Sequence, residues 1–236
     1  MRLIASYKGE AKELAASTII RGDVYSYQFS GGSVTQVRDH TAVGTKAKEI
    51  SANIFGSLME SRKRQLVGKA VEVQIFPSTK KLTDLPDFAD LDDENTGGEA
   101  DRDYSSLPGT GGILIEGTNR IATPISAVEL DERSDDADYP IGYVLTHELG
   151  HTVLDFAAPD LEPKIDELRK SRIAAQQDFL GTDSYTRSTV DEYWAEGTAA
   201  LFNTPIAELY INEYTGKWLT DNDAKLLAQL KSVYLK

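Results

Sequence analysis

The sequence predicts an α+β fold, with a small mixed sheet, one central apolar helix and a mainly helical C-terminal part. Short alternating stretches of the kind that form strands occur only up to Thr123. Apolar residues at helical spacing dominate the chain after that point. The 236 residues suffice for one sizeable domain with a small addition. We therefore expect a β-rich N-terminal extension over residues 1–43 and a main domain over residues 44–236.

The composition is that of an ordinary globular protein, with 40% hydrophobic and 27% charged residues. No apolar run approaches the ~18 residues that a membrane-spanning helix needs. The formal net charge of −13 disfavours nucleic acid and anionic membranes as partners, because both repel an acidic surface. The chain has no cysteine, which excludes disulfides, thiol nucleophiles and cysteine metal ligands.

The N-terminus lacks the apolar core of a cleavable signal peptide, which is about 7 to 15 residues long. We therefore expect a protein that acts in the cytoplasm, is exported by a signal-independent route, or is an excised domain. The sequence does not indicate an oligomeric state.

The first half of the chain is expected to form the sheet. Alternating apolar and polar residues predict strands, and apolar residues at three- and four-residue spacing predict a helix behind them. The glycine-containing turns Ser30-Gly31-Gly32-Ser33 and Gly117-Thr118-Asn119 predict hairpins. The predicted elements are, in order, a hairpin over 23–37, a helix over 45–66 capped by Gly68, a strand over 71–76 and a hairpin over 113–123.

Two acidic stretches, 84–103 and 129–138, interrupt this part of the chain. For the first, a calcium loop is the alternative, but Asn95 occupies the position at which an EF-hand needs glycine. We therefore expect a mobile acidic loop over 84–103.

The second half is expected to be helical. Apolar stripes support this expectation. So do a proline that can occupy a first helical turn and hydroxyl residues that can cap a helix. The predicted features are a helix over 143–156 that begins near Pro140, a helix over 160–177, a loop over 181–184, a helix over 191–200 capped by Ser188 or Thr189, and helices over 207–214 and 223–235.

The helix over 143–156 contains the sequence His147-Glu148-Leu149-Gly150-His151. Histidines four residues apart place both imidazoles on one helix face, where they can bind a single metal ion. Two of the chain's three histidines are used in this way. Glu148 lies beside the pair and can act as a general base toward a water molecule that the metal activates. The pattern is the HExxH motif of zinc metallopeptidases.

A catalytic zinc site needs a third protein ligand, and the helix over 191–200 offers one. Glu192 and Glu196 lie one turn apart on the same face, so one carboxylate can bind the metal while the next accepts a hydrogen bond from a ligand histidine. We assign Glu192 as the third ligand and Glu196 as the support of His147. The alternative is a solvated pair of glutamates. Asp155 either supports the helix or faces solvent.

The two motifs, HELGH and EYWAE, together with Tyr185 seven residues before Glu192, resemble the gluzincin peptidases of the anthrax lethal factor catalytic domain and the clostridial Pro-Pro endopeptidases. The segment Leu107–Gly112 is similar to a Pro-Gly-x-Gly-Gly segment of that family. The resemblance covers roughly residues 104–202. Tyr193, Trp194 and Gly197 depart from the family pattern, which leaves the choice of substrate open.

The resemblance implies a zincin-like metallopeptidase fold and one Zn²⁺ ion bound by His147, His151 and Glu192. It also implies that the phenol of Tyr185 faces the reacting centre. In zincins an extended substrate pairs with an edge strand ahead of the HExxH helix. The candidate residues for that strand are Ile113, Leu114 and Ile115, or Arg120, Ile121, Ala122 and Thr123.

The expected activity is hydrolysis of a peptide or protein substrate by a zinc endopeptidase. The toxin-like motifs and the missing signal suggest an exported effector or toxin domain, with a cytosolic housekeeping peptidase as the alternative. The competing classes are a non-catalytic zinc-binding protein and a protein-interaction module. Structural zinc sites usually have four protein ligands, which disfavours the first of these.

Overall fold

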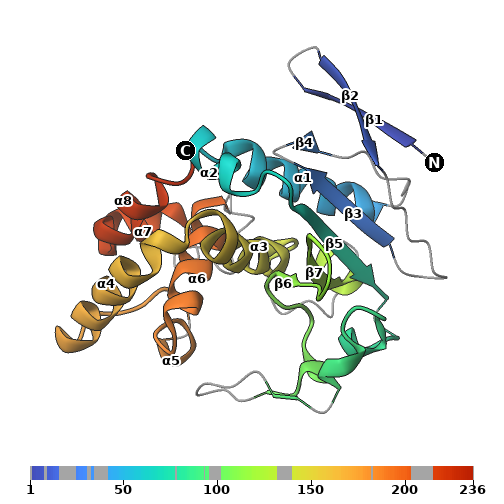
Figure 1. Ribbon diagram of the computed structural model, residues 1–236. Helices are drawn as coiled ribbons and strands as arrows, with labels where there is room; N and C mark the ends of the chain where they lie inside the picture. Colours follow the sequence, from blue (N-terminus) through green and yellow to red (C-terminus); the bar gives the residue numbers. More distant parts are fainter. Residues whose placement is uncertain are drawn as a thin grey trace.

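The computed structural model describes residues 2–7, 10–15, 25–30, 33–34, 42–77, 79–92, 94–95, 102–131, 140–181, 183–202 and 215–235. These residues form a mixed α+β fold, as predicted. A five-stranded sheet in the order β4-β3-β5-β7-β6 lies against helices α1 and α3, and the C-terminal helices lie beyond α3 (Figure 1). Strands β1 (Arg2–Tyr7) and β2 (Glu10–Ala15) form a separate antiparallel pair.

The sheet is mixed, because β5 (Ala70–Phe76) and β7 (Arg120–Ser126) run parallel while the other neighbours are antiparallel. Both central strands are buried on nearly every residue. Two hairpins complete the sheet: β3 (Tyr25–Ser30) with β4 (Ser33–Val34), and β6 (Ile113–Leu114) with β7. The predicted strand over 71–76 and both predicted hairpins are confirmed within the described residues.

Strand β3 pairs along its whole length with β5, so residues 25–30 are hydrogen-bonded to the main sheet. The division of the chain after residue 43 stays a prediction. Residues 207–214, for which a helix was predicted, lie outside the described part of the chain.

The single helix predicted over 45–66 is wrong, because the segment forms α1 (Ala42–Ser57) and α2 (Glu60–Gln65). Residues near the C-terminus separate α1 from α2. Leu235 N donates to Ser57 O at 2.6 Å, and Met59 N donates to Val233 O at 2.9 Å. These bonds engage backbone groups that a continuous helix would use internally. Gly68 has a φ of 83°, the left-handed conformation expected near a helix end.

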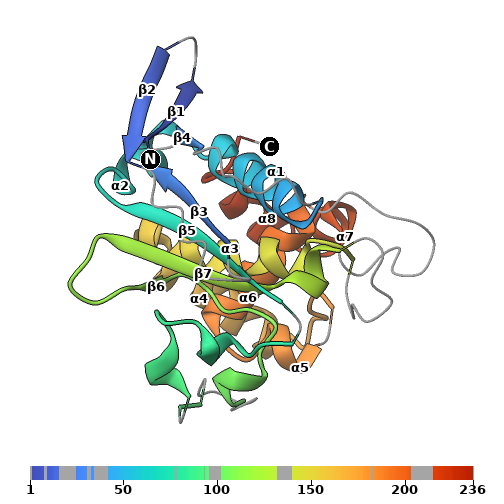
Figure 2. The same ribbon diagram turned by 90° about the vertical axis from the view of Figure 1, so that its right-hand side faces the viewer.

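The segment after β5 is packed, which corrects the mobile loop predicted from 84 onward. Leu82, Leu85 and Phe88 are buried with Phe76 and Leu107 in a second apolar cluster. Three short 3-10 helices form here, and Figure 2 shows the segment next to β6 and β7. They span Leu82–Asp84, Ala89–Leu91 and Tyr104–Ser106. Residues 93 and 96–101 lie outside the described part.

Helices form the remainder of the described chain. The helix begins at Tyr143 as predicted, but Pro140 lies in the turn before α3, where Tyr143 N donates to the Pro140 carbonyl at 2.8 Å, and not in the first turn of the helix. Part of the predicted loop over 181–184 is helical, and the helix α7 was not predicted. The elements are a 3-10 helix at Ala127–Leu130, α3 (Tyr143–Ala157), a 3-10 helix at Pro159–Leu161, α4 (Glu162–Ala174), α5 (Asp183–Thr186), α6 (Val190–Phe202), α7 (Gly216–Asn222) and α8 (Ala224–Leu230).

Helices α3 and α6 pack closely at Gly150. A Cβ atom on Gly150 would lie 3.0 Å from the Cα of Ala195 and 3.1 Å from the Cβ of Thr198, so any side chain here would force the two helices slightly apart. Trp194 is fully buried, and its indole N–H donates to the Gly150 carbonyl at 3.1 Å. This contact fixes which face of α6 turns toward α3. Within the described residues, no helix combines the length and apolar character needed to cross a bilayer.

Candidate metal centre

Three side chains from α3 and α6 converge on one point. His147 and His151 lie one turn apart on α3, and their Nε2 atoms are 3.0 Å apart. Glu192, in the first turn of α6, places its Oε2 atom 3.0 Å from the Nε2 of His147 and 3.7 Å from the Nε2 of His151. The sequence analysis predicted that these three residues form one site, and the structure brings them together. They can hold a metal ion.

The spacing of the three atoms fits a small divalent cation. Ligands at about 2.0–2.1 Å from a tetrahedral zinc ion are separated from one another by about 3.3 Å, which is close to the separations in this site. In the described structure, neither His147 Nδ1 nor Glu192 Oε2 makes a hydrogen bond of good geometry, although both atoms are buried. Glu192 Oε2 faces the Nε2 atoms of the two imidazoles. Such an atom is expected to have a partner, and a cation between it and the two imidazoles would provide one.

The electrostatics of the cluster also favour positive charge. Burial lowers the pKa of His147, but its contacts with Glu192 and Glu196 outweigh this effect and raise the pKa well above its usual range. Burial raises the pKa of Glu192, yet both histidines lower it to a net value below the usual range. These carboxylates therefore stabilise a cation at the centre, whether a proton or a metal ion.

Glu148 lies next to the ligand set on α3 and is buried. Burial is the main cause that raises the pKa of its carboxyl group, and the nearby histidines oppose it. A Cβ atom on Gly109 would lie 3.3 Å from the Cγ of Glu148, so the segment before β6 closes over this side chain. The carboxyl group is thus held in a site with little solvent, beside the three candidate ligands.

Glu196 contacts His147 from the side opposite Glu192. Its Oε1 atom lies 3.2 Å from the Nδ1 of His147, as expected for the second glutamate of the pair. Its Oε2 atom accepts a hydrogen bond from the hydroxyl of Tyr143, at the start of α3. The contribution of Tyr143 was not predicted, since a tyrosine four residues before the first histidine has no distinctive sequence signal.

Tyr185, on α5, lies against the cluster. Its ring is stacked on that of His147, with centroids 6.1 Å apart and an angle of 29°. Burial is the main cause that raises the pKa of its phenol, and Glu192 and Glu148 add to it. The guanidinium of Arg102 lies 5.7 Å from the centre of the Tyr185 ring. Arg102 lies near the end of the acidic stretch 84–103 and gave no sequence signal as part of the site.

The remaining predicted residues lie farther from the cluster. Asp155 is exposed on α3 and, among the described residues, makes no hydrogen bond with the three candidate ligands. Although Asp155 is exposed, packing around its carboxyl removes part of the surrounding water, and this desolvation together with the charge of Asp191 raises its pKa to about 6. Of the two candidate edge strands, β6 lies at the edge of the sheet. The other is corrected: Arg120, Ile121, Ala122 and Thr123 belong to β7, which lies inside the sheet between β5 and β6.

The glycine segment before β6 packs directly on α3. The N–H of Gly112 donates to Thr152 Oγ1 at 3.0 Å, and that hydroxyl donates to the carbonyl of Glu148 at 3.2 Å. A Cβ atom on Gly111 would lie only 2.6 Å from the Cβ of His151. The edge of the sheet and the helix with the two histidines therefore meet without any intervening side chain.

Gly111→Ala is expected to destabilise the protein by about 1–3 kcal/mol, because the new methyl group overpacks the contact with His151. Thermal or chemical unfolding would measure the loss. Gly56→Ala is the matched control, since a Cβ atom on this exposed α1 residue would have no neighbour within 4 Å. That substitution should be neutral or stabilise the protein by up to about 1 kcal/mol. Equal stabilities of the two variants would contradict the close packing.

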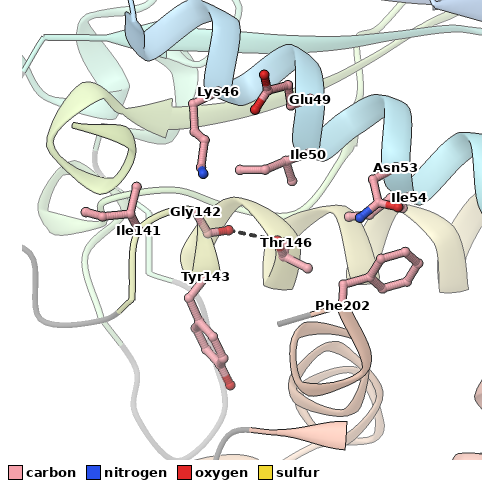
Figure 3. Close-up of a pocket in the computed structure, with 10 residues that line it drawn as sticks. All are labelled: Lys46, Glu49, Ile50, Asn53, Ile54, Ile141, Gly142, Tyr143, Thr146 and Phe202. Carbon is pink, nitrogen blue, oxygen red and sulfur yellow. Dashed lines mark hydrogen bonds between the residues drawn. The ribbon is translucent and has the colours of Figure 1, made fainter. Parts of the chain in front are cut away.

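A cavity of about 220 Å³ lies between α1 and α3, near the start of α3. Figure 3 shows the Lys46 side chain of α1 reaching toward Gly142 at the start of α3, with Ile50 and Thr146 beside it and the Tyr143 ring pointing away from α1. The hydroxyl of Thr146 donates to the Gly142 carbonyl at 2.8 Å and is thereby satisfied within its own helix. Tyr143 is shared between this cavity and the candidate metal centre.

Comparison of the chain with models of protein families and with curated proteins yields no match.

Proposed function

We propose that this protein is a zinc-dependent endopeptidase with a zincin-like fold of the gluzincin type. The observation that supports the proposal is the convergence of His147, His151 and Glu192 beside the buried carboxyl of Glu148. Two imidazoles and one carboxylate leave the fourth position of a tetrahedral zinc ion open, as in catalytic sites. A structural zinc site would have a fourth protein ligand in that position.

The residues of the site have distinct roles in this reaction. Bound zinc would supply Lewis acidity, which polarises a peptide carbonyl and makes water a nucleophile near neutral pH. Glu148 accepts the proton of that water and passes it to the leaving amine. The hydroxyl of Tyr185 donates a hydrogen bond to the oxyanion that develops on the attacked carbonyl. Glu196 accepts the Nδ1 proton of His147, which leaves Nε2 as the ligand atom.

The substrate is expected to bind along β6. This edge strand uses its β7-facing side for pairing, and the other side offers main-chain donors and acceptors to an extended peptide. Leu114 of β6 is 47% exposed and could therefore contact a peptide that binds there. A role as an exported effector or toxin domain is an expectation that rests on the motif resemblance alone.

The proposal is tested with purified protein and a diverse peptide library, with and without a zinc chelator. The expected result is one equivalent of zinc per chain, cleavage of peptides at internal bonds, loss of cleavage with chelator and recovery on addition of zinc. Cleavage that persists after complete removal of metal would contradict the proposal, and so would zinc binding without any hydrolysis.

Tyr185→Phe is expected to lower kcat by roughly 100- to 1000-fold, since loss of one oxyanion donor has an effect of this size. KM and zinc content should change little, because the hydroxyl acts mainly in the transition state. Tyr234→Phe is the control: this buried phenol is near Thr198 Oγ1 at 3.5 Å, and its loss should leave kcat unchanged. Equal kcat values for Tyr185→Phe and the wild type would remove Tyr185 from the reaction.

A further inference from the structure

Tyr143 is connected to the candidate metal centre by a hydrogen bond to one residue, Glu196, which in turn contacts His147. Its side chain is 3% exposed, and its hydroxyl donates to Glu196 Oε2. The other oxygen of the same carboxylate, Oε1, lies 3.2 Å from the Nδ1 of His147. Glu196 is 5% exposed, so its carboxylate lies in a nearly dry environment, with a hydrogen bond at Oε2 and the His147 ring next to Oε1. The sequence of contacts runs from Tyr143 through Glu196 to His147.

The backbone before α3 fixes the position of the phenol. Gly142 has a φ of 82°, the left-handed conformation that favours glycine, and it lies against the side chain of Ile50 from α1. Gly142 N donates to the Glu129 carbonyl at 2.8 Å, and Tyr143 N donates to the Pro140 carbonyl at 2.8 Å. The hydroxyl of Tyr143 is therefore presented to α6 by a constrained turn.

A carboxylate that touches histidine with only one oxygen can rotate, and the histidine ring then loses its orientation. A second hydrogen bond to the other oxygen restricts that rotation. In addition, a buried carboxylate oxygen without a donor is destabilised by desolvation. The hydroxyl of Tyr143 meets both requirements. Its removal would allow Glu196 to turn away from His147 while leaving all three candidate ligands in the chain.

We propose that Tyr143 is a positioning residue of the metal centre, which acts through Glu196 to orient His147 for metal binding. This inference rests on the metal-binding part of the proposed function. It assigns a role to a residue outside both sequence motifs that contain the ligands. It also predicts that the effects of Tyr143 and Glu196 on metal affinity are not independent.

The test is a double-mutant cycle on zinc affinity, measured by competition with a chromophoric chelator. Glu196→Gln is expected to weaken zinc binding by about 10- to 100-fold, the usual effect of losing a partner of a ligand histidine. Tyr143→Phe, which keeps the ring, should weaken it by about 10-fold. The double variant should bind no more weakly than Glu196→Gln alone, because Tyr143 acts through that carboxylate.

Tyr193→Phe controls for a general loss of stability. It removes a comparable buried phenol, whose hydroxyl donates to Asp223 Oδ2 at 2.5 Å. Its zinc affinity should equal that of the wild type even if its unfolding temperature falls. Wild-type zinc affinity in Tyr143→Phe, or losses that multiply in the double variant, would overturn the inference alone. Wild-type protein that binds no zinc would overturn the proposed function as well.

Discussion

Glu148→Gln is expected to lower kcat/KM for peptide hydrolysis by at least about 100-fold while the protein keeps one equivalent of zinc. The amide has nearly the shape of the carboxylate but cannot accept the proton of water, so the substitution removes the base and no ligand. Glu148 lies beside His147 and His151 without being one of the three converging residues. Steady-state kinetics and elemental analysis of the same sample measure both quantities.

The matched control is Glu167→Gln, the same change at an exposed position of α4. Its kcat/KM should equal that of the wild type. Activity within a few-fold of wild type in Glu148→Gln would show that another group accepts the proton. Loss of zinc from Glu148→Gln would show that this residue contributes to metal binding, contrary to the proposed assignment.

His151→Ala is expected to lose stoichiometric zinc and all measurable hydrolysis. It leaves two ligands, His147 and Glu192, and two ligands do not hold zinc as three do in catalytic sites. We expect the dissociation constant for zinc to rise by more than the ~10- to 100-fold typical of losing a residue that supports a ligand. Elemental analysis after dialysis measures the loss, and circular dichroism checks the fold.

His40→Ala is the control for this variant, because His40 is the third histidine of the chain and lies outside the two motifs. It should retain a full equivalent of zinc. A full equivalent in His151→Ala would mean that the bound metal lies elsewhere. Loss of zinc in His40→Ala would add a histidine to the ligand set that the described residues do not include.

The candidate ligands could be predicted because their geometry is local. Helical spacing alone places His147 and His151 on one face, and it also places Glu192 and Glu196 on one face. The structure adds the step that spacing could not provide, which is the close packing of α3 against α6 at Gly150. A glycine within an HExxH motif gives no indication of which helix will approach it. Burial of Trp194 next to it then sets the rotation of α6.

The features that escaped prediction depend on contacts between distant segments. The break after Ser57 arises because the last residues of the chain pair with residues 57–59. The interior position of β7 depends on its parallel pairing with β5, whereas its alternating sequence would equally suit an edge. Tyr143 donates to Glu196, 53 positions later in the chain. In each case the local pattern was compatible with more than one partner.

The two helices that supply the ligands are separated in sequence by α4 and α5, and this has a consequence for folding. A metal ion held by His151 and Glu192 joins two points about 40 residues apart, as a disulfide would, in a chain that has no cysteine. Closing a loop of that length in the unfolded state corresponds to about 4 kcal/mol in the chain-entropy treatment of crosslinks. Metal would then act as a reversible staple around α4, and its removal would loosen the α4–α5 segment before the sheet.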